Sequence, residues 1–224
     1  MSFGSLVFTP LVKKLQERYG SRRQYERMQG SAASDRLTPF EIEFLEQRDS
    51  FYWSTTGATG WPYVQHRGGP KGFLKVIDDR TLAFADFRGN KQYISTGNLM
   101  TDNRVAIIMV DYPRQARLKM LGHVDIIEGE ASNQWIERVR VPGYKAVIER
   151  VFAIHIEAYD WNCPQHITPR YTAEEIRDGM TAVEKRVEAL EEENKMLRKA
   201  LTQSQAGQPP CENHSAVPER KPPR

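Results

Sequence analysis

Fixed positive charges and glycines lie close together between His66 and Lys75. Arg67 can engage two phosphate oxygens at once, and Lys75 on the following strand would add a point charge. The glycines between these two cations let a ligand approach the backbone closely. The segment therefore suits a phosphate group, with a solvated basic hairpin as the alternative interpretation.

A second cluster of cations and amides follows, where a strand is expected to end and a short helix or structured loop to begin. The cluster consists of Arg88, Asn90, Lys91 and Gln92. Backbone N–H donors at such a junction favour anions, so this cluster and the first could converge on one phosphate. The polar residues that follow are weaker candidates, placed by proximity alone: Ser95, Thr96 and Asn98.

A third motif, residues 159–167, follows the last predicted strand and contains Cys163, Gln165 and His166. A zinc site built on Cys163 and His166 would need two more ligands, and the other histidines form no second cluster. A cysteine nucleophile lacks a third residue to orient the histidine. We therefore expect no metal site, and a loop that only caps the fold is the alternative for this motif.

Helical patterns come first among the elements that must position these residues. Apolar residues at four-residue spacing predict a helix over residues 10–28, with Gly20 as a stop. Residues 30–35 are small and polar, as in a linker. Thr38 then offers an N-cap, with Glu41 three residues later, for a helix that runs to about residue 48.

The pattern changes after residue 49, where aromatic and β-branched residues predict strands separated by turns. About seven strands are expected, over residues 51–55, 62–67, 73–77, 81–86, 105–110, 117–130 and 150–159. The first four follow one another closely and predict a meander. Gly122 indicates a bulge or bend in a long strand, and residues 131–139 are expected to form a helix. Many strands with few helices predict a mainly β, α+β barrel.

A heptad pattern begins near the C-terminal end. Its core positions, at alternating spacings of four and three, are Ile176, Met180, Val183, Val187, Leu190, Asn194, Leu197 and Leu201. Asn194 occupies the first core position of its heptad. A lone Asn at the first core position favours a parallel two-stranded coiled coil, because two such side chains pair across the axis. The flanking charges agree, since Arg186 would meet Glu191 of a second chain and Glu193 would meet Arg198. The alternative is a single amphipathic helix that lies on its own barrel.

Composition limits which classes of protein the chain could belong to. Hydrophobic residues make up 39% and charged residues 27%, as in water-soluble globular proteins. A formal charge of +3 is too mild to indicate nucleic-acid binding, and Pro164 and Pro169 interrupt any basic helix that could lead into the heptads. The sequence has no run as long as a transmembrane helix and has only two cysteines, so we expect no membrane association and a cytoplasmic location.

The order of the basic motifs and strands resembles the flavin site of the pyridoxamine 5'-phosphate oxidase-like family. The resemblance extends from about Leu37 to about Tyr171 and is carried by WPYVQHRGGPKGFLKVIDDRTLAFADFRGNKQYISTGNL. It implies a split β-barrel that holds FMN at the interface of a homodimer. It also implies that Arg67 and Lys75 grip the FMN phosphate, with the cluster at residues 88–92 on a second edge.

The chain departs from the oxidase pattern in the Gly-Gly-Pro-Lys-Gly sequence after Arg67 and in extra residues between Lys91 and Asn103. These differences leave the identity of the substrate open, but they do not argue against flavin binding. Residues 159–167 would border the isoalloxazine ring. The candidate cofactor-binding residues are His66, Arg67, Lys75, Arg88, Asn90, Lys91, Gln92, Ser95, Asn98, Gln165 and His166.

The sequence thus predicts an N-terminal helical segment over residues 1–36, a flavin-binding split barrel over 37–171, a coiled-coil helix over 172–203 and a disordered tail over 204–224. The expected function is that of an FMN-dependent oxidoreductase acting on a small-molecule substrate. The rivals are a non-enzymatic module of the same fold that binds heme or flavin, and a deazaflavin-dependent reductase.

Overall fold

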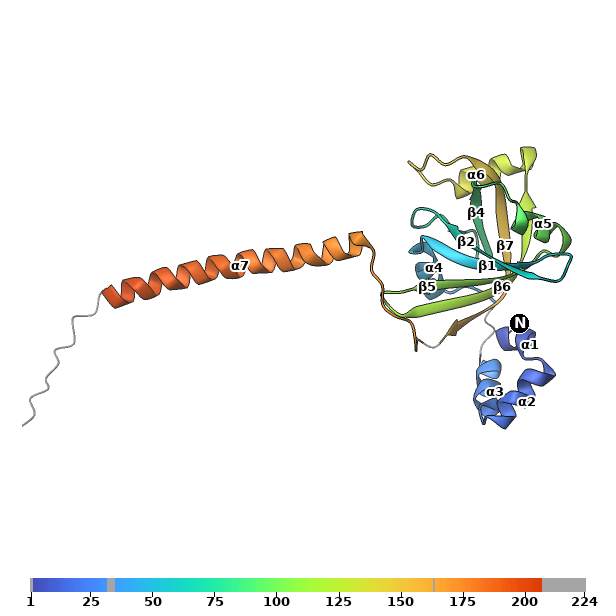
Figure 1. The fold of residues 1–224 in the computed structure, drawn as a ribbon, viewed down its shortest axis with the longest axis horizontal. Helices are drawn as coiled ribbons and strands as arrows, with labels where there is room; N and C mark the ends of the chain where they lie inside the picture. Colours follow the sequence, from blue (N-terminus) through green and yellow to red (C-terminus); the bar gives the residue numbers. More distant parts are fainter. Residues whose placement is uncertain (1, 32–34, 163, 207–224) are drawn as a thin grey trace, which may run out of the picture. The chain divides into compact units, whose positions relative to one another are not determined.

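The computed structural model describes residues 2–31, 35–162 and 164–206 of the chain (Figure 1). The chain divides into two compact units, Met1–Arg170 and Tyr171–Arg224. The first unit holds the β-sheet and helices α1 to α6, and the described part of the second holds helix α7, Ala173–Ala206. None of the helices in the described ranges is both long and apolar enough to cross a membrane. The tail predicted to be disordered lies outside the described residues from residue 207 onward.

Three helices precede the sheet: α1 (Phe3–Val7), α2 (Pro10–Arg18) and α3 (Arg22–Ser31). The stop predicted at Gly20 is confirmed, because this residue has a φ of 77° and separates α2 from α3. Helix α3 extends into the segment predicted as a linker. The short helix α1 has no apolar period long enough to be recognised from sequence.

Helix α4 (Pro39–Glu46) begins with the predicted capping box, which is confirmed. The backbone N–H of Thr38 donates to the Glu41 carboxylate at 3.0 Å, and the Thr38 hydroxyl donates to the same oxygen at 2.5 Å. Trp161 Nε1 donates to the other Glu41 oxygen at 2.8 Å. The buried Glu41 side chain therefore fixes the start of α4 against the last strand of the sheet.

The Glu41 carboxylate makes the stability of the fold depend on pH. Burial works to raise the pKa of Glu41, but hydrogen bonds from Thr38 and Trp161 outweigh burial and lower it from 4.5. A lowered folded-state pKa stabilises the fold above the unfolded-state value, and this contribution is lost as pH falls through the folded-state value. Urea unfolding between about pH 7 and about pH 3 should show a steeper acid loss of stability in the wild type than in Glu41→Gln. Parallel curves would contradict this role.

The sheet contains seven strands, and every pairing is antiparallel. The strands are β1 (Ser50–Thr56), β2 (Pro62–Gly68), β3 (Lys75–Val76), β4 (Thr81–Phe87), β5 (Arg104–Asp111), β6 (Ala116–Ile127) and β7 (Ile148–Asn162). Their order in the sheet is β2-β1-β5-β6-β7-β4-β3. The prediction of a mainly β, α+β fold is confirmed, with a curled sheet whose two edges are β2 and β3.

The prediction that the first four strands form a meander is wrong. Strands β2 and β3 lie at opposite edges, because β1 pairs with β5 and β4 pairs with β7. The segment between them is held by backbone hydrogen bonds from Gly69 to Asp49 at 2.9 Å and from Gly72 to Arg48 at 3.1 Å. Phe73 and Leu74 were expected to be in the third strand, but they enter the core and leave only two residues in β3.

The bulge predicted at Gly122 is confirmed, since the register of β6 against β7 shifts between Leu121 and Gly122. A Cβ at Gly122 would lie 2.5 Å from the carbonyl oxygen of His155, so only glycine fits this close approach of two backbones. Two helices and a 3₁₀ turn complete the unit: α5 (Ile94–Thr101), the turn Gly129–Ala131 and α6 (Ser132–Val139).

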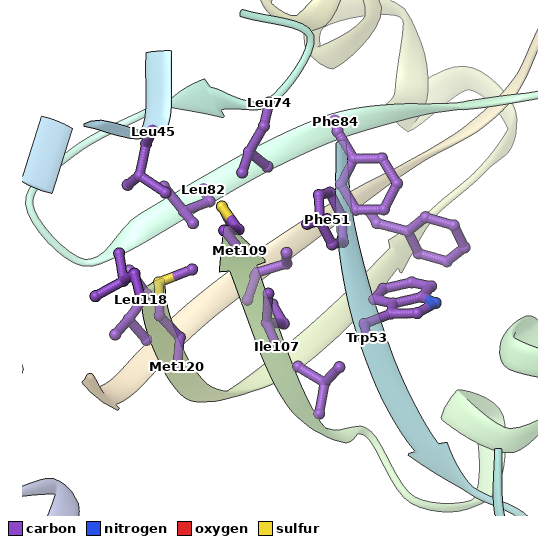
Figure 2. Packing of buried hydrophobic residues seen from close by; sticks show 14 of the residues in the cluster. Leu45, Phe51, Trp53, Leu74, Leu82, Phe84, Ile107, Met109, Leu118 and Met120 are labelled. Carbon is purple, nitrogen blue, oxygen red and sulfur yellow. The ribbon is translucent and has the colours of Figure 1, made fainter. Parts of the chain in front are cut away.

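Aromatic side chains fill the concave side of the curled sheet. Phe51, Trp53 and Phe84 are each 1% exposed, and Figure 2 shows them together at one end of the core. Phe84 lies 5.2 Å from Phe51 and 5.3 Å from Phe152 between ring centroids. The aliphatic residues Leu82, Met109 and Leu118 pack at the other end (Figure 2). The aromatic end of the core forms the floor under the candidate site described next.

Candidate functional site

A small cleft of about 60 Å³ lies between β2, the end of β4 and the turn that leads into α5. This volume is far below the roughly 300–1,000 Å³ of sites that enclose a whole drug-sized ligand. The cleft is therefore large enough for only part of a cofactor. Its lining consists of Gln65, Arg67, Asp86, Phe87, Gly89, Asn90, Lys91, Gln92, Tyr93, Ile94, Ser95, Thr96 and Glu149.

Arg67 forms the inner wall of the cleft. Its guanidinium lies 4.8 Å from the Trp53 ring and 5.4 Å from the Phe152 ring, over the aromatic end of the core. One terminal nitrogen donates to Asp86 at 2.6 Å, and the side chain is only 15% exposed. Its Nε is buried and has no hydrogen-bond partner among the described residues. Arg150 Nε, beside the same aspartate, and Trp53 Nε1 are also buried without a hydrogen-bond partner among the described residues, so these donors gather around Asp86 and the aromatic end of the core.

Arg48 shows what a purely structural arginine looks like in the same fold. Its side chain is 14% exposed, pairs with the buried Asp111 at 2.7 Å and lies 4.9 Å from the Phe44 ring. Unlike Arg67, it uses its Nε to donate to the Phe44 carbonyl at 3.2 Å. Both arginines are buried, and each pairs with its own aspartate and lies against its own aromatic ring. They differ at Nε, which has no partner among the described residues in Arg67.

Asp86 lies between two guanidinium groups. Arg67 contacts one of its oxygens, and Arg150 lies 3.3 Å from the other. Burial raises the pKa of the Asp86 carboxyl, and the two arginines oppose that rise. Burial likewise lowers the pKa of Arg67. Asp86 therefore holds both arginines in place.

Glu149 links the second basic cluster to the cleft. Arg88 Nε lies 3.0 Å from a Glu149 oxygen, and this hydrogen bond is the main cause that lowers the pKa of Glu149. Arg88 itself does not line the cleft, and it contacts the lining through its ion pair with Glu149. Arg150 stacks over the Tyr93 ring at 5.0 Å.

The turn before α5 has an unusual backbone. Lys91 has a φ of 59° and Tyr93 a φ of 52°. These values lie in the left-handed region, which residues other than glycine seldom adopt. Tyr93 occupies the N-cap of α5 but makes no side-chain cap hydrogen bond with the described residues. Helix N-termini attract anions when their N–H groups are left open. Backbone strain at two residues of one turn indicates that the surrounding structure enforces this arrangement.

The structure brings several of the predicted site residues together at the cleft. They are Arg67, Asn90, Lys91, Gln92 and Ser95. The weaker candidate Thr96 also lines it. Ser95 donates to the Gln65 side-chain oxygen at 2.8 Å, which ties α5 to β2. Asn98 lies outside the lining, and its amide donates to Thr55 at 3.0 Å, so it fixes α5 to β1.

Two further candidates lie on the other face of the sheet. His66 precedes Arg67 in β2, and adjacent strand residues point to opposite faces, so His66 is exposed beside the Tyr52 ring. Lys75 is paired with Ala83, whose side chain packs under α6 on the face opposite Asp86. Neither of them lines the cleft.

The third motif contributes nothing to the cleft lining. Gln165 and His166 are exposed after β7, and His166 has a φ of 66°. Cys163, the other half of the rejected metal pair, lies outside the described residues. Within residues 2–31, 35–162 and 164–206, no three His, Cys, Asp or Glu side chains gather closely enough to hold a metal ion.

Sequence reasoning missed Gln65, Asp86, Tyr93 and Glu149 as lining residues. Strand alternation could have found Gln65, because it lies two residues before Arg67 on the same face. The pairing of Asp86 with Arg67 could not have been found in this way, because it joins strands that are not neighbours in the sheet.

The cleft fits a phosphate. Arg67 and Lys91 are its lining cations, and the lining carboxylates Asp86 and Glu149 are each paired with arginine. Lys91 has no ion pair within the described part of the chain, so its charge stays available. The Arg67 guanidinium, an unpaired lysine and the start of α5 together suit an anion with several acceptor oxygens.

Comparisons with known proteins agree with this fold. Residues 37–161, more than half of the chain, match the model of the family described as pyridoxamine 5'-phosphate oxidase. No curated protein matches the sequence.

Among solved structures, HupZ of Group A Streptococcus is 21% identical, covers 60% of this chain and 100% of its own, and has a TM-score of 0.44. A protein of Clostridium acetobutylicum related to general stress protein 26 of B. subtilis is 15% identical over 61% of this chain and 94% of its own, with a TM-score of 0.41. HutZ, the heme storage protein of Vibrio cholerae, is 17% identical over 56% of this chain and 94% of its own, with a TM-score of 0.39. On the match of its residues 37–161, the chain belongs to the pyridoxamine 5'-phosphate oxidase family.

Proposed function

We propose that the protein is an FMN-dependent oxidoreductase and that the cleft beside Arg67 receives the FMN phosphate. The observation that carries this proposal is the cleft lining, which brings Arg67, Lys91 and the start of α5 together. The membership of the chain in a family of oxidases supports the choice of flavin over other phosphorylated ligands.

Each lining residue has a defined task in this proposal. Arg67 and Lys91 bind the phosphate oxygens, and the backbone at the start of α5 adds N–H donors. Asp86 orients Arg67, and Ser95 holds α5 against Gln65 so that the cleft keeps its width. The bound flavin supplies hydride or electron transfer, while the protein supplies binding and orientation.

We propose further that a second copy of the chain covers the rest of the FMN, so that the cofactor lies at the interface of a homodimer. The cleft of about 60 Å³ leaves most of such a ligand outside the wall of one chain. The elements that form the cleft also expose apolar side chains. Ile94 and Met100 on α5 are 40% and 77% exposed. A second chain would cover these surfaces together with the flavin ring.

The phosphate grip predicts that the protein distinguishes FMN from riboflavin. Riboflavin has the same ring and ribityl chain but no phosphate, so it leaves Arg67 and Lys91 without their ligand. Two charge-assisted hydrogen bonds of about 1.5 kcal/mol each correspond to a preference of roughly 100-fold for FMN. Fluorescence titration of the ligand-free protein with both flavins measures this ratio. Equal affinities, or tighter binding of heme or of a deazaflavin than of FMN, would contradict the proposal.

A further inference from the structure

Helix α7 carries an apolar stripe along its length. The apolar residues at the heptad core positions are Ile176, Met180, Val183, Val187, Leu190, Leu197 and Leu201, and each is between 43% and 63% exposed. A regular helix over Ala173–Ala206 keeps these positions on one side. Seven large apolar side chains at 3.5-residue spacing form an exposed surface of the kind that a soluble protein covers with a partner.

We propose that α7 pairs with α7 of a second copy of this chain in a parallel, in-register, two-stranded coiled coil. The occupant is indicated by the heptad itself, because the 3.5-residue period matches a second helix with the same period. Asn194 indicates the orientation. A parallel pair in register places the two copies of Asn194 side by side, whereas an antiparallel pair along the whole stripe would set this amide against an apolar side chain.

The charges beside the stripe complement each other in the same register. In a parallel pair, Arg186 meets Glu191 of the partner subunit, and Glu193 meets Arg198 of the partner subunit. Within one helix Arg198 donates to the Asn194 oxygen at 3.2 Å, so both side chains lie on the surface that the partner would cover. This charge pattern is independent of the apolar stripe and selects the same partner.

Two adjacent residues allow a matched test. Leu197 lies at a core position and Met196 next to it lies outside the core, yet they are 63% and 66% exposed in the single chain. Cysteine is introduced at one or the other position in the full chain, with Cys163 and Cys211 changed to serine. Under mild oxidation Leu197→Cys should form disulfide-linked dimers at least about 10-fold faster than Met196→Cys, because in-register core residues face each other across the axis.

The position of Leu197 also reports orientation. It lies near the C-terminal end of the stripe, so an antiparallel pair keeps the two copies of residue 197 far apart. Selective cross-linking of Leu197→Cys supports the parallel coil. Equal rates at the two positions, or the absence of cross-linked dimers, overturn the proposal, and a helix that lies on its own barrel would give the latter result.

A further substitution separates the coil from the flavin site. Adding Leu190→Asp to the Leu197→Cys chain should reduce its cross-linking rate to that of Met196→Cys, because a buried pair of carboxylates disrupts the core. The FMN content of this variant should not change, since Leu190 takes no part in the cleft lining. An undiminished cross-linking rate would show that the stripe is not the contact surface.

Discussion

Replacing Arg67 with alanine should lower the affinity for FMN by at least about 100-fold. The reason is the loss of the guanidinium charge and its hydrogen-bond donors at the wall of the cleft. Charge-assisted hydrogen bonds of about 1.5–3 kcal/mol each account for a loss of this size. The affinity is measured by fluorescence titration with FMN below the unfolding temperature of the variant. Arg67→Lys keeps the charge but not the planar fork of donors, so it should recover only part of the affinity.

Arg48→Ala is the matched control. Arg48 has nearly the same exposure, aspartate pairing and aromatic contact as Arg67, but lies away from the cleft. Removal of either arginine from its aspartate should reduce the free energy of unfolding by about 3 kcal/mol. Only Arg67→Ala should lose FMN. If both variants bind FMN like the wild type, Arg67 is a second structural arginine and the assigned phosphate grip is wrong.

Phe84→Ala has the largest expected effect on stability. Phe84 is 1% exposed and lies within 5.5 Å, between ring centroids, of Phe51, Trp53 and Phe152. Truncation of a core phenylalanine leaves a cavity and reduces the free energy of unfolding by about 3–5 kcal/mol. The Arg67 guanidinium lies 6.0 Å from this ring, so the floor of the cleft is lost together with the packing. Urea or thermal unfolding of the ligand-free protein measures the change.

Phe40→Ala provides the control of the same residue type. Phe40 is 64% exposed and has one ring contact, with Trp161 at 5.1 Å. Its loss should reduce the free energy of unfolding by at most about 1 kcal/mol. Similar losses in the two variants would mean that the aromatic cluster is not the main source of stability in this unit.

Local chemistry explains which parts of the fold could be predicted from sequence. The capping box at Thr38, the stop at Gly20 and the bulge at Gly122 depend on residues close in the chain or on one glycine. The order of the strands depends on contacts between distant segments. Period and turn signals could not show that β2 and β3 lie at opposite edges, because sequence neighbours usually pair in a sheet.

The same contrast between local signals and contacts among distant segments applies to the candidate site. Residue type, the order of the motifs along the chain and the family resemblance led to Arg67 and to Lys91, because guanidinium and ammonium groups suit phosphate. Which other residues line the cleft depends on the face of the strand to which each side chain points. His66 and Arg67 are adjacent and equally polar, yet only Arg67 faces the cleft, and Gln65 faces it for the same reason. Strand alternation, applied before residue type, would have removed His66 and added Gln65.

Native mass spectrometry of the purified full-length chain tests the central claim most directly, because it reports the bound ligand and the number of subunits together. The account predicts an assembly of two chains, or of four where the coil joins separate dimers, that carries one FMN per chain, and release of FMN when the protein is denatured. A chain that carries heme, or that remains free of ligand after incubation with excess FMN, would contradict the account.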